Sequence, residues 1–344
     1  METKILTASD QDIRIAARII RSGGLVAFPT ETVYGLGANG LDPKAVCKVY
    51  EAKGRPSDNP MIMHIARASD IGQLTPAISQ TAVSLIDSFW PGPLTLVVWK
   101  RPEVPDAATG GLGTVAVRMP DDAAALALIR EAGCPVAAPS ANLSGRPSPT
   151  KPSHVLDDLS GKIDAIILGG ECRVGIESTV LDVTGETPTV LRPGVVTAED
   201  IEAVIGCRVE LDPTLLGFDP AHPMKGVFGE HDTVAFTPKA PGMKYRHYAP
   251  RAEMAVIEGL PSKVRSEIER IKAANERIGN RVGVVLFEEK AFREAAHDFF
   301  AKLREMDSEE VDLILAGALS DTDGVGFAVM NRMLKSAGYN IIKV

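Results

Sequence analysis

The sequence predicts an α/β protein of two domains, in which a large mixed sheet with helices is followed by a small parallel sheet. Its 344 residues are about twice the length of an average domain. In the first 206 residues, helical patterns alternate with short apolar runs, and several of these runs follow one another directly, which is typical of a mixed sheet. From residue 253 onward, strand and helix patterns alternate regularly, which is typical of parallel strands joined by helices.

The helices of the N-terminal part are predicted from their end signals and apolar faces. Ser9 and Asp12 have the spacing of a capping box, and Pro43 directly after Asp42 is a typical helix start. Glycines follow the last residues of several of these patterns, as they commonly do at helix ends. We therefore expect helices over residues 9–23, 42–54, 121–132 and 197–206.

Short apolar runs between these helices predict the strands of the first sheet. We expect extended segments over residues 25–28, 61–65, 94–98, 115–117, 135–139, 165–168, 179–183 and 189–191. Residues 35–40 match the glycine pattern GxGxxG, but residues 29–34 separate them from the preceding strand. We interpret them as a bend that allows a close backbone approach, not as a dinucleotide site.

Residues 207–252 are expected to form a linker, because they contain six prolines and no sustained period. We also expect this linker to act as a lid over the first domain, since it carries a cationic and aromatic strip. Within them, residues 244–248 alternate cationic side chains with two tyrosines. Such a strip is suited to covering an anionic ligand and stacking on a base. A passive tether is the alternative interpretation.

The C-terminal part, residues 253–344, is predicted to form the second domain. Its apolar runs and amphipathic segments follow one another in the order βαβαβαβ. We expect strands over residues 254–257, 282–287, 311–316 and 340–344, and helices over residues 262–278, 290–306 and 326–337. This order predicts a small parallel sheet with helices as crossovers.

Charge and hydropathy argue against several kinds of partner. With 37 Lys and Arg against 45 Asp and Glu, the formal net charge is −8, whereas a general nucleic-acid coat needs a basic surface. Apolar runs such as residues 123–129 are far shorter than the roughly 18 residues of a membrane-spanning helix. The first residues, METKILTASDQ, lack the apolar core of a signal peptide. We therefore expect a soluble cytoplasmic protein with no membrane partner.

Cysteine spacing and known motifs exclude further classes. The four cysteines form no CxxC pair, so neither a disulfide framework nor a zinc ribbon is expected. The chain contains no GxxxxGK[ST] motif, which excludes a P-loop NTPase. The chain shows neither an HExxH motif nor a recognisable Ser-His-Asp order, so a conventional hydrolase is not indicated.

Lys53 and Arg55 form a candidate phosphate-binding pair just past a predicted helix end. Arginine offers two parallel donors and lysine a point charge, and both suit phosphate oxygens. The alternative is a solvated helix C-terminus, where cations interact favourably with the helix dipole. Asn59-Pro60 follows the pair, and His64 lies in the next predicted strand, where a structural role is the usual one for a lone histidine.

Polar residues at the ends of later strands form a second candidate group. Ser140, Asn142 and Ser148 follow a predicted strand and are suited to binding a nucleotide, although a simple turn uses the same residue types. Arg118 and Arg192 each end a predicted strand, where either side chain can hold a carboxylate or cap the sheet.

Together these residues give the chain a resemblance to the long, two-domain form of the threonylcarbamoyl-AMP synthase family. The matching segments are PTETVYGLG at 29–37, the Lys53-x-Arg55 pair, Asn59-Pro60, Ser140-x-Asn142 and the run at 241–250. The resemblance covers essentially the whole chain. It implies a YrdC-like N-terminal domain, a mixed twisted sheet with helices, and a small Rossmann-like C-terminal domain with a parallel sheet.

The resemblance also implies an activity. Members of this family make threonylcarbamoyl-AMP and pyrophosphate from L-threonine, bicarbonate or CO2, and ATP, and the product serves threonylcarbamoyl modification of an adenosine in tRNA. We expect Mg²⁺ to arrive with ATP and no dedicated metal site in the protein. The partners implied are these substrates and the proteins that transfer the threonylcarbamoyl group, and no contact with tRNA is required.

Specific positions take roles through the same resemblance, residue by residue. Threonine would be surrounded by Thr32, His64, Arg118, Ala138 and Ser178. ATP would be held by Lys53, Arg55, Asn59, Thr114, Ser140, Asn142, Ser148, Arg192 and Tyr245. Lys53 and Arg55 would carry the catalytic charge, since no conventional base is apparent.

Two other functions remain as alternatives at this level. One is a double-stranded-RNA-binding module, because YrdC-like domains present a basic concave face, and the net charge of −8 argues weakly against it. The other is a hydrogenase-maturation carbamoyltransferase, which shares the YrdC-like domain. It would require zinc-type cysteine pairs and a much longer chain.

Overall fold

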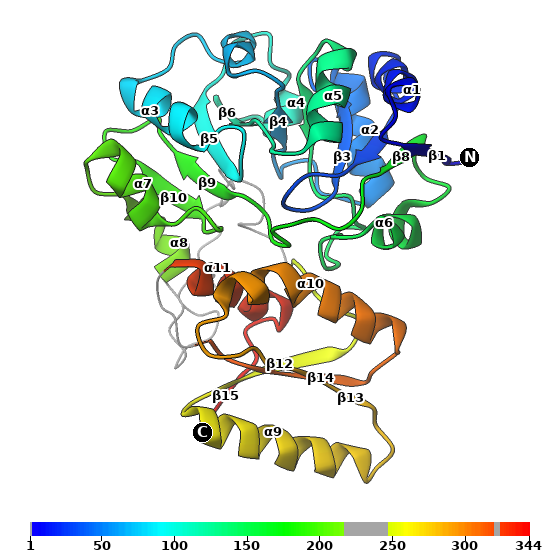
Figure 1. The fold of residues 1–344 in the computed structure, drawn as a ribbon, viewed down its shortest axis with the longest axis vertical. Helices are drawn as coiled ribbons and strands as arrows, with labels where there is room; N and C mark the ends of the chain where they lie inside the picture. Colours follow the sequence, from blue (N-terminus) through cyan, green and yellow to red (C-terminus); the bar gives the residue numbers. More distant parts are fainter. Residues whose placement is uncertain (1, 217–246, 320–323) are drawn as a thin grey trace, which may run out of the picture.

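The two predicted sheets are both present in the computed structural model, which describes residues 2–216, 247–319 and 324–344. The described strands form an eleven-stranded mixed sheet in the order β1-β8-β2-β3-β7-β4-β6-β5-β9-β10-β11 and a four-stranded parallel sheet in the order β13-β14-β12-β15. The large sheet and its helices, blue to green in Figure 1, lie above the smaller yellow-to-red domain. The predicted fold class is confirmed.

The first sheet and its helices occupy residues 4–216. Its strands are β1 Lys4–Thr7, β2 Val26–Phe28, β3 Gly35–Asn39, β4 Ile62–His64, β5 Leu94–Trp99, β6 Thr114–Arg118, β7 Val136–Ala138, β8 Ala165–Leu168, β9 Thr179–Asp182, β10 Thr189–Arg192 and β11 Glu210–Leu211. Its helices are α1 Asp10–Arg21, α2 Pro43–Lys53, α3 Gln80–Phe89, α4 Asp106–Thr109, α5 Ala123–Ala132, α6 Pro152–Leu159, α7 Ala198–Ile205 and α8 Pro213–Leu216, with a 3-10 turn over Ala68–Gln73.

Helix caps predicted from the sequence are formed. The Ser9 side chain accepts a hydrogen bond from the backbone N–H of Asp12 at the start of α1. Asp42 caps α2 in the same way, and Gly54 ends that helix with φ of 63°, a left-handed conformation that favours glycine. α2 therefore ends at Lys53, two residues before Arg55.

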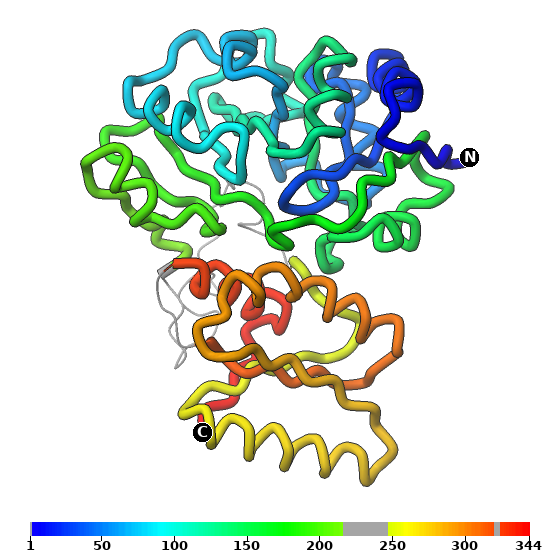
Figure 2. Tube along the Cα trace, in the orientation of Figure 1, coloured from blue at the N-terminus to red at the C-terminus, as the bar shows by residue number. Residues whose placement is uncertain are grey.

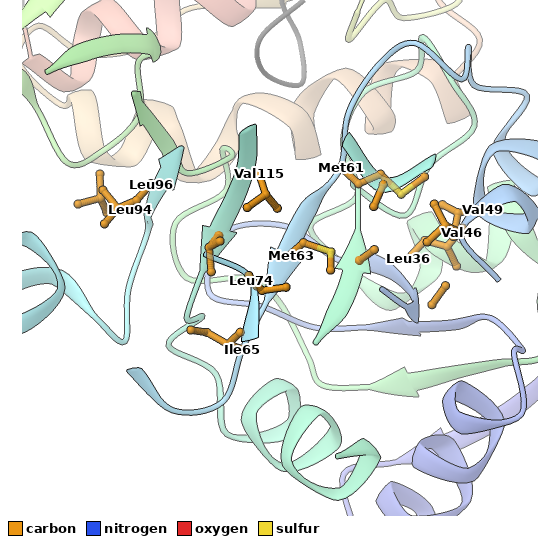
Figure 3. Close-up of a cluster of buried hydrophobic side chains, with 14 of the residues drawn as sticks. Leu36, Val46, Val49, Met61, Met63, Ile65, Leu74, Leu94, Leu96 and Val115 are labelled. Carbon is orange, nitrogen blue, oxygen red and sulfur yellow. The ribbon is translucent and has the colours of Figure 1, made fainter. Parts of the chain in front are cut away.

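Helices cover both faces of the large sheet and enclose two apolar layers. On one face, α1 and α5 pack on β2, β7 and β8 through side chains such as Ile20 and Leu128. On the other face, α2, α3, α6 and α7 pack over a larger cluster that includes Leu36, Met63 and Leu74 (Figure 3). Side chains alternate between the faces along each strand, so this burial fixes the register of the sheet.

Local structure differs from the sequence prediction in several places. Residues 35–39 form strand β3, where the sequence predicted a bend, although the predicted close approach is present. No helix was predicted from the sequence where α3, α4 and α6 lie, and no strand where β1 lies. Residues 210–216 carry β11 and α8 within a segment expected to be irregular. The boundaries 1–206, 207–252 and 253–344 stay a prediction.

The second sheet carries helices on both of its faces. Its elements are β12 Glu253–Glu258, α9 Pro261–Glu276, β13 Val282–Val285, α10 Phe292–Ser308, β14 Leu313–Gly317, α11 Gly324–Ser336 and β15 Ile341–Lys343, in the predicted order. Helix α9 packs on one face with Val264 and Ile268, and α10 and α11 pack on the other.

The two domains share one apolar cluster. Val33 and Ile176 of the first domain lie in the same buried cluster as Phe299, Phe300 and Val329 of α10 and α11. In the trace of Figure 2, α10 and α11 are the elements of the second domain that face the first. No helix among the described residues has both the length and the apolar character needed to cross a membrane.

Substituting Gly37 by alanine should destabilise the fold. A Cβ at this position would lie 2.7 Å from Cγ1 of Val136 and 2.9 Å from the ring of Phe28, so neighbouring strands would have to move. We expect a loss of about 1–3 kcal/mol in the free energy of unfolding, measured with urea. Gly72→Ala, where a Cβ meets nothing within 4 Å, is the control and should change it by less than about 0.5 kcal/mol.

Candidate active site

A pocket lies over the central strands β4, β6 and β7, on the sheet face where the side chains of Ile62 and His64 point. The segments around it are the turn after β2, the ends of β6, β7 and β10, and the residues just before β9. Among the residues predicted for the site, those that line it are Thr32, Arg55, His64, Arg118, Ala138, Ser140, Ser178 and Arg192. These residues span 160 positions of sequence, and the sheet brings them together.

Arg118 occupies the side of the pocket predicted for threonine. Its guanidinium donates 2.9 Å to the Thr32 hydroxyl and 3.2 Å to the Gly92 carbonyl, and it forms an ion pair with Glu31. Arg118 and Glu31 are each 3% exposed, so this pair is almost fully removed from water. Glu31 balances the charge of Arg118, and the planar guanidinium is suited to binding a carboxylate.

His64 is neutral at physiological pH. Burial, and next the charge of Arg118, lower its pKa to about 3. Its ring lies edge-on to Phe28 with centroids 6.0 Å apart, and its Nδ1 lies 3.1 Å from the carbonyl oxygen of Ile62. A neutral ring here adds shape and a polar edge to the pocket without a second positive charge beside Arg118.

Arg192 is held against Ser178 at the other side of the pocket. Its Nε and Nη2 donate to the Ser178 carbonyl at 3.0 and 2.9 Å, and Nη2 lies 3.1 Å from the Ser178 hydroxyl. The hydroxyl also lies 2.8 Å from that of Thr95. Burial lowers the pKa of Arg192, which remains a cation whose partners here are mainly neutral oxygens. Such a site favours an anion.

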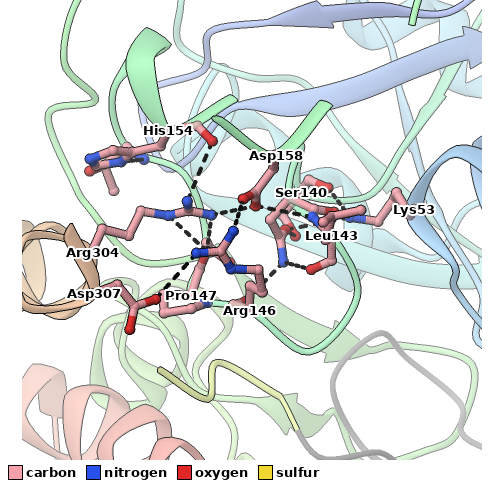
Figure 4. A network of polar contacts seen from close by, with 12 residues as sticks. Lys53, Ser140, Leu143, Arg146, Pro147, His154, Asp158, Arg304 and Asp307 are labelled. Atoms are coloured by element: carbon pink, nitrogen blue, oxygen red, sulfur yellow. Dashed lines mark hydrogen bonds and ion pairs between the residues drawn. The ribbon is translucent and has the colours of Figure 1, made fainter. Parts of the chain in front are cut away.

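Arg55 and Lys53 are placed differently. Arg55 lines the pocket, where it donates to the Pro60 carbonyl at 3.0 Å and the Asn59 carbonyl at 3.3 Å, and burial lowers its pKa to about 10. Lys53 is only 2% exposed and donates to the carbonyls of Ser140 and Asn142 (Figure 4). Burial lowers the pKa of Lys53 well below its usual value. Lys53 therefore holds the loop that carries Ser140, and it does not line the pocket.

The other described residues predicted for ATP do not line the pocket. Asn142 donates its amide to the carbonyls of Leu143 and Arg146, at 2.8 and 2.9 Å, and so shapes the loop after β7. Thr114 starts β6, four residues from Arg118, opposite Trp99 of β5. The buried Asn59 accepts a hydrogen bond through its backbone carbonyl, and the Ser148 hydroxyl donates one to the Glu177 carboxylate. Tyr245 lies outside the described residues.

The lining residues that were not predicted include Glu177, His247 and Tyr248. Tyr248 is 6% exposed, its ring lies 5.1 Å from that of Phe300, and burial raises its pKa to about 12. Burial also lowers the pKa of His247 to about 3, so both rings are neutral. Both belong to the cationic and aromatic strip at 244–248, so a sequence signal existed. Glu177 is marked in the sequence only by its place before Ser178.

The carboxylates around the pocket are already paired. Glu31 is bound by Arg118, and Glu177 forms an ion pair with Arg332 at 3.1 Å. Among the described residues, no group of three or more His, Cys, Asp or Glu side chains could hold a metal ion. Mg²⁺ bound to a nucleotide takes most of its octahedral shell from phosphate oxygens and water.

Comparisons with known proteins cover both domains. A family model described as telomere recombination matches residues 18–194, and the model of the threonylcarbamoyl-AMP synthase C-terminal domain matches residues 196–338. The threonylcarbamoyl-AMP synthase of Pyrococcus abyssi is 51% identical over 342 residues, which cover 96% of each chain. The chain belongs to the threonylcarbamoyl-AMP synthase family. The resemblance read from the sequence is confirmed, and the protein is an enzyme of this nucleotidyltransferase-type class.

Other relatives of this threonylcarbamoyl-AMP synthase family member agree. The Bacillus subtilis threonylcarbamoyl-AMP synthase is 46% identical over 358 residues, which cover 99% of this chain and 97% of the relative. The crystal structure of P. abyssi Sua5 complexed with L-threonine has a TM-score of 0.90 at 48% identity, and the match covers 99% of this chain and all of that one. Escherichia coli YciO, at 26% identity and a TM-score of 0.51, matches 57% of this chain.

The histidine at position 64 should make stability sensitive to acid. Its folded pKa of about 3 lies below the value near 6.5 of an unfolded histidine, so the stability it contributes is present above pH 6.5 and is lost as the pH falls toward 3. Between pH 7.5 and 5 this loss is roughly 2 kcal/mol. Urea unfolding at the two pH values should show a smaller loss for His64→Gln than for the wild type, and equal losses would contradict the neutral buried ring.

Proposed function

We propose that this chain makes threonylcarbamoyl-AMP and pyrophosphate from L-threonine, bicarbonate or CO2, and ATP, in the cytoplasm. The observation that carries the proposal is that Arg55, Arg118 and Arg192 converge on one pocket that also presents the hydroxyls of Ser140 and Ser178. Glu31 balances the charge of Arg118, whereas Arg55 and Arg192 are buried mainly beside neutral carbonyls, so an anion bound in the pocket would stabilise both of them. A substrate carboxylate and a triphosphate are anions of the required kind.

In this proposal, threonine binds at the Arg118 side. Arg118 receives the carboxylate, while Thr32, Ser178 and the backbone of Ala138 surround the rest of the amino acid. His64 is close to this group because it is the register partner of Arg118 in the neighbouring strand. ATP occupies the opposite side, with Arg55, Ser140 and Arg192 toward the phosphates. Lys53, Asn59, Asn142 and Ser148 act mainly by shaping the loops there, and Thr114 lies at the far end of β6.

The chemistry then needs positioning and charge neutralisation more than a base. The neutral amine of threonine adds to CO2, loses a proton and becomes a carbamate. A carbamate oxygen attacks the α-phosphorus of ATP and forms a new P–O bond. The bond from the α-phosphorus to the bridging oxygen breaks, and pyrophosphate leaves with its electron pair. Because the nucleophile is already an anion, the protein has to align two anions and neutralise the charge that develops. Arg55 and Arg192 supply that charge, and Mg²⁺ on the phosphates supplies more.

The product is a mixed anhydride, which water hydrolyses readily. A buried site limits this side reaction by excluding water, and His247 and Tyr248 contribute to the cover of the pocket. We propose that the product passes to proteins that transfer the threonylcarbamoyl group to an adenosine of tRNA, so this chain itself need not bind tRNA. The proposed lid depends mostly on residues 217–246, which lie outside the described residues.

Release of pyrophosphate from ATP should depend on both L-threonine and bicarbonate. Arg55→Ala should lower kcat/KM about 10- to 100-fold, because the loss of a charge-assisted contact costs roughly 1.5–3 kcal/mol. Arg270→Ala is a matched control, since Arg270 is exposed on α9 and pairs there with Glu267 of the same helix. Release that ignores threonine, or equal rates for both variants, would overturn the proposed reaction or the role of Arg55, respectively.

Threonine should be distinguished from its analogues by its hydroxyl. A site that bonds a hydroxyl leaves its own polar groups unpaired when the analogue lacks it, so 2-aminobutyrate should be a poor substrate. Serine, which lacks only the methyl group, should have a lower kcat/KM than threonine, by a factor equivalent to about 1–3 kcal/mol. Pyrophosphate release with each amino acid measures both effects, and comparable kcat/KM for 2-aminobutyrate and threonine would disprove the hydroxyl contact.

A further inference from the structure

A fully buried arginine of the second domain reaches into the wall of the pocket. Arg332 lies on α11 and is 0% exposed. Its Nε bonds the Glu177 carboxylate at 3.1 Å, its Nη2 lies 3.4 Å from the Glu177 carbonyl, and its Nη1 donates to the Pro193 carbonyl. One side chain of the C-terminal domain thus connects two separate loops of the N-terminal domain.

Both loops carry pocket residues. Glu177 itself lines the pocket and precedes Ser178, and Pro193 follows the lining residue Arg192. The second oxygen of the Glu177 carboxylate accepts a hydrogen bond from the Ser148 hydroxyl. Glu177 therefore joins three segments, and Arg332 closes the connection.

The backbone fits the same arrangement. Gly175 has φ of +85°, and a Cβ on it would lie 2.3 Å from the carbonyl oxygen of His297 in α10. The loop 175–178 therefore lies directly against the second domain, and a glycine is needed for this approach. Two independent features, a close backbone contact and a buried ion pair, both fix the loop 175–178 against the second domain.

We propose that Arg332 is a positioning residue for the reaction: through Glu177 and Pro193 it sets the places of Ser178 and Arg192, so that the pocket is complete only when the C-terminal domain is docked. This inference rests on the proposed function. It gives the second domain a role in the geometry of the reaction, although that domain supplies no side chain of the predicted substrate-binding set.

Energetics favour positioning over simple stabilisation. A buried ion pair loses much of its Coulomb energy to desolvation, and apolar replacements of such pairs are often neutral for stability. Burial alone would raise the pKa of Glu177, but Arg332 and then Arg192, helped by Ser148, hold it below its usual value. Glu177 is therefore ionised. The other groups that face it are Lys335 of α11 and Tyr248.

The test compares Arg332→Met with Glu177→Gln and the double variant, all in the full chain. Arg332→Met leaves the Glu177 carboxylate without its nearest cation, so its pKa should rise and an acid limb should appear in kcat/KM as the pH is lowered from 8. At pH 8 we expect a loss of 10-fold or more in kcat/KM for ATP. The double variant, which has no carboxylate to titrate, should lack the acid limb.

Met333→Ala is the matched control for stability. Met333 is the next residue of α11, is 0% exposed and packs in the shared apolar cluster. It should lower the melting temperature and leave the pH profile of kcat/KM unchanged. If Arg332→Met behaves in the same way, Arg332 is structural only and the inference is overturned.

The design separates the two proposals. A wild-type protein that releases no threonine-dependent pyrophosphate disproves the proposed function, and binding of L-threonine and of ATP, measured by calorimetry on the same proteins, then tests the positioning. Wild-type affinities in Arg332→Met and Glu177→Gln would overturn it, and affinities weakened 10-fold or more would support it. If Arg332→Met does not fold, Glu177→Gln, which keeps the size of the side chain, carries the test alone.

Discussion

Positive charge buried over the central strands is the constraint on which the rest of this structure depends. A guanidinium withdrawn from water must find carboxylate or carbonyl partners, or its burial costs several kcal/mol. Glu31 meets this need for Arg118, and the Ser178 carbonyl meets it for Arg192. These partners lie in loops next to strands, so the demand for hydrogen bonds fixes the loops as firmly as apolar packing fixes the sheet. The pocket is what remains between them.

The sequence predicted the parts of this protein that obey short-range rules. The cap at Ser9 and the helix end at Gly54 form as expected, because each depends on neighbours within a few positions. The strand at 35–39 was predicted as a bend, because its glycines obscure the period-2 pattern. The ring of Phe28 and the branched side chain of Val136 pack against Gly37, which explains why the segment is nevertheless extended.

The site shows the same division. Its arginines could be singled out because each follows a strand or a helix end, and the family resemblance grouped them. Local sequence could not show that Lys53 turns away from the pocket to bond the Ser140 carbonyl, nor that Glu177 lines it. Both facts depend on which loops the sheet brings together across more than 80 residues. Arg332 is a stronger case, since its partner lies 155 residues away in the other domain.

The shared apolar cluster explains why a second domain can influence the first. Val33, beside the threonine side of the pocket, and Ile176, beside Glu177, are buried against Phe299 and Val329. If the second domain separated, these side chains would be exposed to water, and the ionised Glu177 would lose the guanidinium of Arg332. Apolar burial supplies the affinity between the domains, but it is not directional and tolerates small shifts. The hydrogen-bonded ion pair is directional, and it is therefore the contact that sets the position of the loop before Ser178 relative to Arg192.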